Sequence, residues 1–202
     1  MNVRIAAPIS TAFLMCASAF GANLFLDAKD DQPVAADFRG AEWGDEIAQD
    51  EIALTARVIT TRIAKMSWGA IFKIEFTDLK SRAEKRREIR PEYFIVTDDQ
   101  IVLLNEEDNE AAAKKLTAMD KPPEFEPSYI YGITRGKVER EDGPYTTKIE
   151  LKGDQCIYLT HHNSGHFKKV VWKKRVGLVE YSMGYGAAKD GFRLKRVSSK
   201  GR

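Results

Sequence analysis

All three histidines of the chain lie within the six-residue segment 161–166, which is the part of the sequence best suited to metal chemistry. The sequence Asn-Ser-Gly inside this segment is typical of a three-residue hairpin loop, in which Gly165 adopts the left-handed conformation and His162 pairs with His166. Strand alternation then places His161 on the opposite face, so only two imidazoles share a face. A zinc site needs three or four ligands. We therefore predict a turn with paired, partly exposed histidines and no metal site.

The cysteine nearest to this hairpin is the second side chain with possible chemistry. Continuing the hairpin register pairs Tyr158 with Val170 and Cys156 with Trp172, so the face that carries the paired histidines becomes apolar within a few residues. A catalytic thiol would need a histidine base beside it. We instead predict a buried, reduced Cys156, which a bulky thiol reagent labels slowly unless the protein is denatured.

Other catalytic signatures do not occur in the sequence. It has no phosphate-binding glycine loop, no paired-cysteine metal motif and no Gly-x-Ser-x-Gly elbow. The glycines between residues 184 and 191 are explained by a bend and a hairpin turn between two strands. We therefore assign no catalytic, cofactor-binding or metal-binding residue, and we expect no cofactor.

The elements that must position these side chains follow the alternation of β-strands. Segment 52–66 fits either a helical stripe or strand alternation, and its abundant β-branched residues favour a strand. Segment 70–76 alternates cleanly, and segment 93–104 reads as a hairpin with turn-forming residues at its tip. From residue 128 onward, strand follows strand, with a turn at 141–144. No helix there is long enough for a parallel crossover.

One helix interrupts this pattern. Asn105 can cap its first turn, three acids favour its positive N-terminal end, and segment 121–123, Lys-Pro-Pro, ends it. The charge run 80–90 reads as an exposed helical turn or loop. The predicted fold class is mainly β: an antiparallel meander that forms a curved sheet or open barrel, with one short helix.

The N-terminal residues have the layout of a secretory signal. No charged side chain occurs between Arg4 and Asp27, and an apolar stretch runs into the small residues 17–19. We predict a signal peptide over residues 1–19, with the exported protein beginning near Phe20 and located in the periplasm or secreted.

An uncleaved membrane anchor is the alternative reading of the same segment. Pro8 and many small residues make the apolar centre shorter than the roughly 20 residues that a membrane span needs. Lipidation at Cys16 is disfavoured, because segment 13–15, Phe-Leu-Met, stands where a lipoprotein has a small residue. We expect contact with a membrane only if the N-terminal segment is retained.

Charge and composition divide the remaining chain. Segment 20–45 is rich in acids and reads as a flexible lead-in, 46–197 as a single β-rich domain, and 198–202 as a disordered tail. The net charge is only +2, but bases dominate from Lys168 onward.

A basic end of this kind could dock on lipid headgroups, anionic glycans or nucleic acid. Alternation divides the bases, with Lys168 and Lys174 on one face of their strand and Lys169 and Lys173 on the other. We therefore predict no nucleic-acid partner, and no retention on heparin or anionic vesicles at about 0.15 M salt.

Segment 172–180, Trp-Lys-Lys-Arg-Val-Gly-Leu-Val-Glu, resembles the closing motif of a broad group of exported bacterial β-sheet proteins and lipoproteins. These proteins often end in an aromatic residue, two or three further residues, and Gly-Val-Gly-Leu-Val with a charge. Segment 155–159 is similar to the cysteine-bearing strand that often precedes the motif. The chain departs from the motif at Arg175, where the group usually has glycine. The resemblance implies an exported antiparallel sheet, and no catalytic residue, since the group is largely uncharacterised.

These observations favour an exported, non-catalytic β-rich module that binds an unidentified ligand or envelope partner, or that has a structural role. One alternative is a hydrolase whose active site no motif reveals, and another is a basic module that docks on anionic surfaces. A cleft with convergent polar groups of perturbed pKa would favour the hydrolase.

Overall fold

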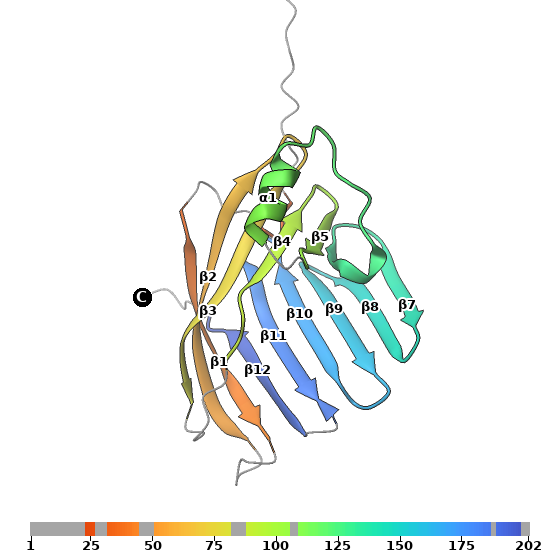
Figure 1. The fold of residues 1–202 in the computed structure, drawn as a ribbon. Coiled ribbons are helices and arrows are strands. Elements are labelled where there is room, and N and C mark those ends of the chain that lie inside the picture. Colours follow the sequence, from red (N-terminus) through yellow and green to blue (C-terminus); the bar gives the residue numbers. More distant parts are fainter. Residues whose placement is uncertain are drawn as a thin grey trace, which may run out of the picture.

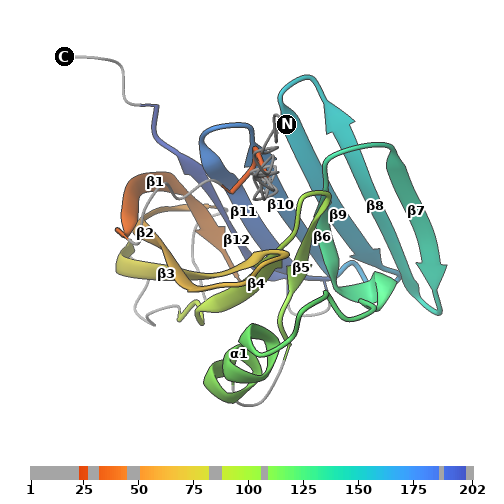
Figure 2. The same cartoon turned by 90° about the horizontal axis from the view of Figure 1, so that it is seen from above.

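Twelve antiparallel strands form one sheet in the computed structural model, which describes residues 23–26, 32–44, 51–81, 88–105, 109–186 and 189–198. The strand order is β6-β5-β4-β3-β2-β1-β12-β11-β10-β9-β8-β7, and the sheet rolls into a nearly closed, barrel-like shape with one α-helix beside it (Figures 1 and 2). The predicted fold class, a curved antiparallel sheet with one short helix, is confirmed.

The elements of the first half are β1 (Val34–Trp43), β2 (Ile52–Lys65), β3 (Ala70–Ser81), β4 (Glu92–Val96), β5 (Gln100–Leu103), α1 (Asn109–Thr117), the 3-10 turn η1 (Pro127–Tyr129) and β6 (Ile130–Ile133). Those of the second half are β7 (Lys137–Asp142), β8 (Tyr145–Lys152), β9 (Gln155–His162), β10 (Phe167–Lys173), β11 (Gly177–Tyr185) and β12 (Asp190–Arg196). The predicted strand over 52–66 and the hairpin over 93–104 are confirmed as β2 and as β4 with β5.

Every pair of neighbours in the sheet is consecutive in sequence except β1 and β12, which form a seam between the two ends of the chain. Their register runs from Phe38 opposite Arg196 to Trp43 opposite Gly191. Gly40 permits this close approach, because a Cβ atom there would lie 1.7 Å from the carbonyl oxygen of Arg193.

The two edge strands, β6 and β7, follow one another in the chain but do not pair, which leaves the barrel open on that side. Strand β6 instead packs against the inner face of the second half. There Trp172 Nε1 donates to the carbonyl oxygen of Tyr131 at 3.0 Å, and the Ile133 N–H donates to Cys156 Sγ at 3.3 Å. These bonds satisfy polar groups that the interior would otherwise leave unpaired.

The main core fills the inside of the rolled sheet, and a smaller core lies between α1 and the outer face of β4 and β5. Trp172, Phe38 and Phe94 are among the fully buried side chains of the main core. The smaller core includes Trp68 and Leu116.

Residues 23–26, which we call the strap, cross the end of the barrel and bury the side chains of Asn23, Phe25 and Leu26, whereas Leu24 is exposed. The Asn23 amide nitrogen donates to the carbonyl oxygen of Thr97 at 2.9 Å, and the Arg175 N–H donates to the carbonyl oxygen of Leu24 at 2.6 Å. The strap therefore links the β4–β5 turn to the β10–β11 turn. Phe25 is 1% exposed, and burying a side chain of this size stabilises the fold by about 1.5–3 kcal/mol.

The predicted flexible lead-in over 20–45 is wrong for β1 and for the strap. Strand β1 is hard to see in the sequence because its inner face has the small Ala36 between Val34 and Phe38, while the charged Asp37 and Arg39 point outward. It is a strand because β2 and β12 pair with it on both sides. Tertiary pairing overrides a composition that favours a loop.

The helix is shorter than predicted, since α1 ends at Thr117 rather than at the Lys-Pro-Pro segment. The predicted cap at Asn105 borders residues 106–108, which lie outside the described ranges. In the charge run 80–90, β3 continues to Ser81 and Ile89 is buried, so the prediction of a wholly exposed loop is wrong at both ends. The predicted leader 1–19 and most of the predicted tail 198–202 are likewise outside those ranges. Within the described part of the chain, no helix has the length and apolar character needed to cross a membrane.

Candidate ligand cavity

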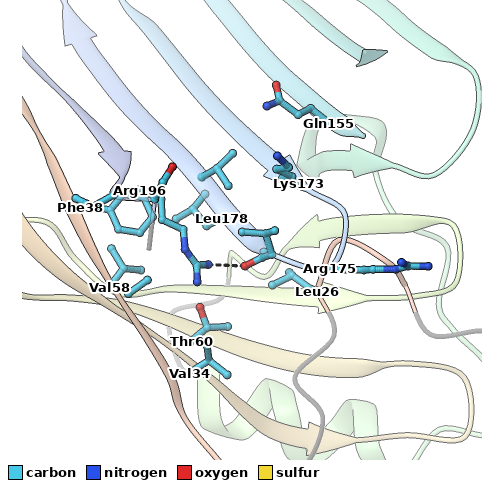
Figure 3. Close-up of a pocket in the computed structure, with 16 residues that line it drawn as sticks. Leu26, Val34, Phe38, Val58, Thr60, Gln155, Lys173, Arg175, Leu178 and Arg196 are labelled. Atoms are coloured by element: carbon cyan, nitrogen blue, oxygen red, sulfur yellow. Dashed lines mark hydrogen bonds between the residues drawn. The ribbon is translucent and has the colours of Figure 1, made fainter. Parts of the chain in front are cut away.

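A cavity of about 550 Å³ opens where β1 begins and β12 ends, beside the strap. Its volume lies within the usual range for small-molecule sites. Its walls come from the strap and from β1, β2, β9, β10, β11 and β12, and Figure 3 shows lining side chains around a central opening. The apolar wall residues are Leu26 from the strap, Val34, Ala36 and Phe38 from β1, Val58 from β2, Val176 from the β10–β11 turn, Leu178 and Val179 from β11, and Val197 after β12. Polar side chains, among them Thr60, Gln155 and Lys173, complete the lining.

Arg196 extends its guanidinium into this cavity, whose lining is partly apolar and partly polar (Figure 3). Alternation along β12 explains the direction, because Phe192 and Leu194 on the same face belong to the main core. The only polar contact of the half-buried guanidinium in the described structure is a hydrogen bond that it donates to the carbonyl oxygen of Val176. Burial lowers the pKa of Arg196. Desolvation of a cation that lacks a counter-ion is costly, so an anion would stabilise it.

The two other bases of the cavity are engaged elsewhere. Lys173 Nζ lies 3.3 Å from Asp154 Oδ2, and the Arg175 side chain points away from the opening (Figure 3). Arg175 has a φ of 63°, in the left-handed region. The described lining includes no Asp, Glu, His or Cys side chain.

A second inward-facing cation, Lys168 on β10, has a complete set of partners. Its Nζ atom forms a salt bridge with Glu92 of β4 and lies 4.8 Å from the ring centroid of Tyr131. The Tyr181 hydroxyl donates to Glu92 Oε1 at 2.9 Å. Burial, and next the charge of Glu92, raise the pKa of Tyr181 well above its ordinary value. Burial also raises the pKa of Tyr131 and of Tyr158, whose rings stack at 4.1 Å.

The predicted histidine hairpin is confirmed in its register. The His162 N–H donates to the carbonyl oxygen of His166 at 2.8 Å, and Gly165 has a φ of 87°. Farther along, Tyr158 pairs with Val170 and Cys156 with Trp172. The rings of His162 and His166 are 5.6 Å apart, whereas His161 lies on the other face near Phe167. In the ranges that the structure describes, no group of three or more His, Cys, Asp or Glu side chains could hold a metal ion.

Cys156 is a free thiol with no exposed surface, as predicted. Burial raises its pKa, and the Ile133 N–H is the backbone group that contacts its sulfur. A thiol held in this way is a poor nucleophile, because the reactive form is the thiolate.

The bases of the C-terminal strands divide between the two faces as alternation predicts for Lys168, Lys169 and Lys174, whereas Lys173, predicted on the face of Lys169, lines the cavity. Lys168 and Lys174 contact inward-facing aromatic rings, whereas Lys169 points outward and lies 2.9 Å from Glu180. Arg193 lies 3.7 Å from Glu51 on the outer face. The basic end therefore does not form one continuous surface of unpaired charge.

The sequence did not single out Arg196 as a cavity residue, because it was grouped with the other bases of the C-terminal end. Its position two residues after Leu194 and four after Phe192 was a signal for an inward direction. No signal in the sequence showed that its partner would be a carbonyl group alone.

A further apolar cavity, of about 710 Å³, lies between α1 and the outer face of β4 and β5. Its charged lining residues, Lys115, Glu124 and Glu126, are exposed, so it offers apolar contact without an inward polar group to orient a ligand. No model of a known protein family matches this chain, and a search among curated proteins finds no match.

Proposed function

We propose that this protein is an exported, non-catalytic binding module that holds a small amphipathic anion, such as a long-chain carboxylate, in the cavity beside the strap. The observation that carries the proposal is the Arg196 guanidinium beside the apolar wall residues of this cavity, where no carboxylate of the described chain pairs with it. A guanidinium can bind a carboxylate through two parallel hydrogen bonds. Apolar walls would then bury the hydrocarbon chain of the same ligand.

A non-catalytic role agrees with the side chains around this site. General acid and base catalysis needs titratable groups within reach of the ligand, and the described cavity lining includes no Asp, Glu, His or Cys side chain. This argument also makes a hydrolase the weaker alternative at this cavity.

The test is calorimetric titration of the protein with dodecanoate below its micellar concentration, with dodecan-1-ol as the uncharged comparison. We expect dodecanoate to bind more tightly than the alcohol. Arg196→Gln removes the charge and should weaken dodecanoate binding roughly tenfold to a hundredfold, since a charge-assisted hydrogen bond is worth about 1.5–3 kcal/mol.

Arg193→Gln is the matched control, because Arg193 is on the same strand but faces outward beside Glu51. It should bind dodecanoate as the unaltered protein does. Equal affinity for the acid and the alcohol, or equal loss in both variants, would argue against a carboxylate held by Arg196.

Export has a separate test. Two features support cleavage before Phe20. The predicted leader ends in small residues at 17–19 and has no acidic side chain, and segment 172–180 resembles exported proteins. Intact-mass analysis of the protein from the natural host should show residues 1–19 removed, and their retention would contradict the proposed processing.

A further inference from the structure

Four aromatic side chains form a row across the inner face of the sheet, at the end opposite to the strap. They are Tyr145 on β8, His162 at the end of β9, His166 in the hairpin loop and Tyr185 at the end of β11. Neighbouring ring centroids are 4.6, 5.6 and 5.6 Å apart. In Figure 1 these strand ends lie together at the lower edge of the sheet.

The row remains open to solvent, unlike the aromatic residues of the core. Tyr145 is 46% exposed and Tyr185 is 41% exposed, and both histidines are half-buried. The Ser164 N–H donates to His162 Nδ1 at 3.0 Å, so the neutral ring has its proton on Nε2. The row therefore offers ring faces together with hydroxyl and N–H groups, held in place by adjacent strands.

A cavity of about 380 Å³ begins at Tyr185 and continues the row inward. Its lining is mostly polar and includes Arg90, Asn105 and the Tyr181 hydroxyl. Amide, guanidinium and phenol groups can donate or accept several hydrogen bonds at once. Such a site suits a ligand with many hydroxyl groups.

The charges at this end are of both signs and do not favour an ionic ligand: the adjoining cavity is lined by Arg90 as well as by Glu88 and Glu92. The row itself has no lysine or arginine, and Lys168, the nearest inward base on β10, is paired with Glu92. A single-stranded nucleic acid would require a cationic groove along its phosphates. The ring planes are also tilted by 62°, 37° and 75° from one neighbour to the next, which does not suit a column of parallel flat bases.

We infer that the row Tyr145–His162–His166–Tyr185 and the adjoining cavity form a second binding site, for a neutral oligosaccharide. Aromatic faces would contact the C–H faces of successive sugar rings, and the polar cavity would receive the hydroxyl groups of a terminal sugar. This site is independent of Arg196, which lies at the other end of the inner face.

The test is calorimetric titration with three neutral hexasaccharides, cellohexaose, chitohexaose and maltohexaose, beside a thymidine hexanucleotide as the anionic comparison. We expect at least one hexasaccharide to bind. The double variant Tyr145→Ala/Tyr185→Ala should weaken that binding by about tenfold or more, since each aromatic contact is worth about half to one and a half kcal/mol. Both side chains are exposed, so the variant should fold.

Ile63→Ala, which truncates a 40% exposed side chain on β2, is the matched control and should leave hexasaccharide affinity unchanged. The inference would be overturned by no binding of any hexasaccharide, by binding that the double variant retains, or by tighter binding of the hexanucleotide than of every sugar. Arg196→Gln should bind the hexasaccharide normally, which separates this site from the carboxylate site.

Discussion

Lys168 and Arg196 are both cations that point into the rolled sheet, yet their surroundings differ in one decisive respect. Lys168 has a carboxylate partner in Glu92, and two tyrosine rings lie close to its charge. Among the described residues, Arg196 has a single polar partner, the carbonyl oxygen of Val176. A buried charge that is fully paired belongs to the architecture, whereas one that lacks a counter-ion is stabilised when an anion arrives. The comparison separates a cation with a carboxylate partner from one without such a partner among the described residues of the same face.

The tyrosines around Lys168 give the largest expected effect, which appears at alkaline pH. Tyr131, Tyr158 and Tyr181 have raised pKa values in the folded state, so their contribution to stability is complete below about pH 10 and is lost as the pH rises toward those values. The free energy of unfolding should fall by about 1.4 kcal/mol per pH unit for each tyrosine.

Urea unfolding between pH 9 and about pH 11.5 measures this slope. Tyr158→Phe removes one of the three tyrosines, so the slope of the unfolding free energy against pH should become shallower by one tyrosine's contribution. Tyr145→Phe, at an exposed position, should leave the slope unchanged. A stability that does not vary across this range would contradict the raised pKa values.

Removing the partner of Lys168 should have the next largest effect. Glu92→Leu leaves a buried lysine unpaired and should destabilise the protein by about 3–5 kcal/mol, measured as the shift in the urea midpoint. The double variant Glu92→Leu/Lys168→Met removes both charges and should recover most of the loss. If Glu92→Leu alone leaves the urea midpoint unchanged, burial of Lys168 does not require the carboxylate of Glu92.

Giving Arg196 a partner should make it resemble Lys168. Figure 3 shows Thr60 of β2 beside the guanidinium, so Thr60→Glu should place a carboxylate in the cavity. Dodecanoate binding in the calorimetric assay should weaken at least about tenfold, because the new carboxylate occupies the guanidinium. Thr60→Gln, of nearly the same size, should weaken it much less. Equal effects of the two variants would indicate a steric cause.

The smallest expected effect is at Arg175, at the rim of the same cavity. Its φ of 63° costs a residue with a side chain about 1–2 kcal/mol relative to glycine. Arg175→Gly should therefore raise the free energy of unfolding by about 1 kcal/mol, as seen in thermal or urea unfolding. Lys174→Gly changes a neighbouring base without this backbone conformation and should give no gain. If Arg175→Gly also fails to raise the free energy of unfolding, contacts of the Arg175 side chain offset the backbone strain.

Much of the sheet could be predicted because each hairpin is local. The pairing of Cys156 with Trp172, and of His162 with His166, follows from alternation and one loop of known type. Strand β1 and the strap could not be predicted in this way, because their partners are distant in sequence. The cavity shares this limit, since Leu26, Val58 and Arg196 become neighbours only when the sheet has closed.

The seam between β1 and β12 determines which truncated chains can be tolerated. A chain that stops before residue 190 lacks β12, which lies in the middle of the sheet. Losing a strand at the edge of the sheet would disturb the fold less. It would expose the edges of both β1 and β11, and open edges pair readily with other chains. During synthesis, β1 is therefore made long before its second partner, and the sheet can close only when almost the entire chain has been released. Incomplete chains of this protein should consequently tend to aggregate rather than form a smaller folded unit.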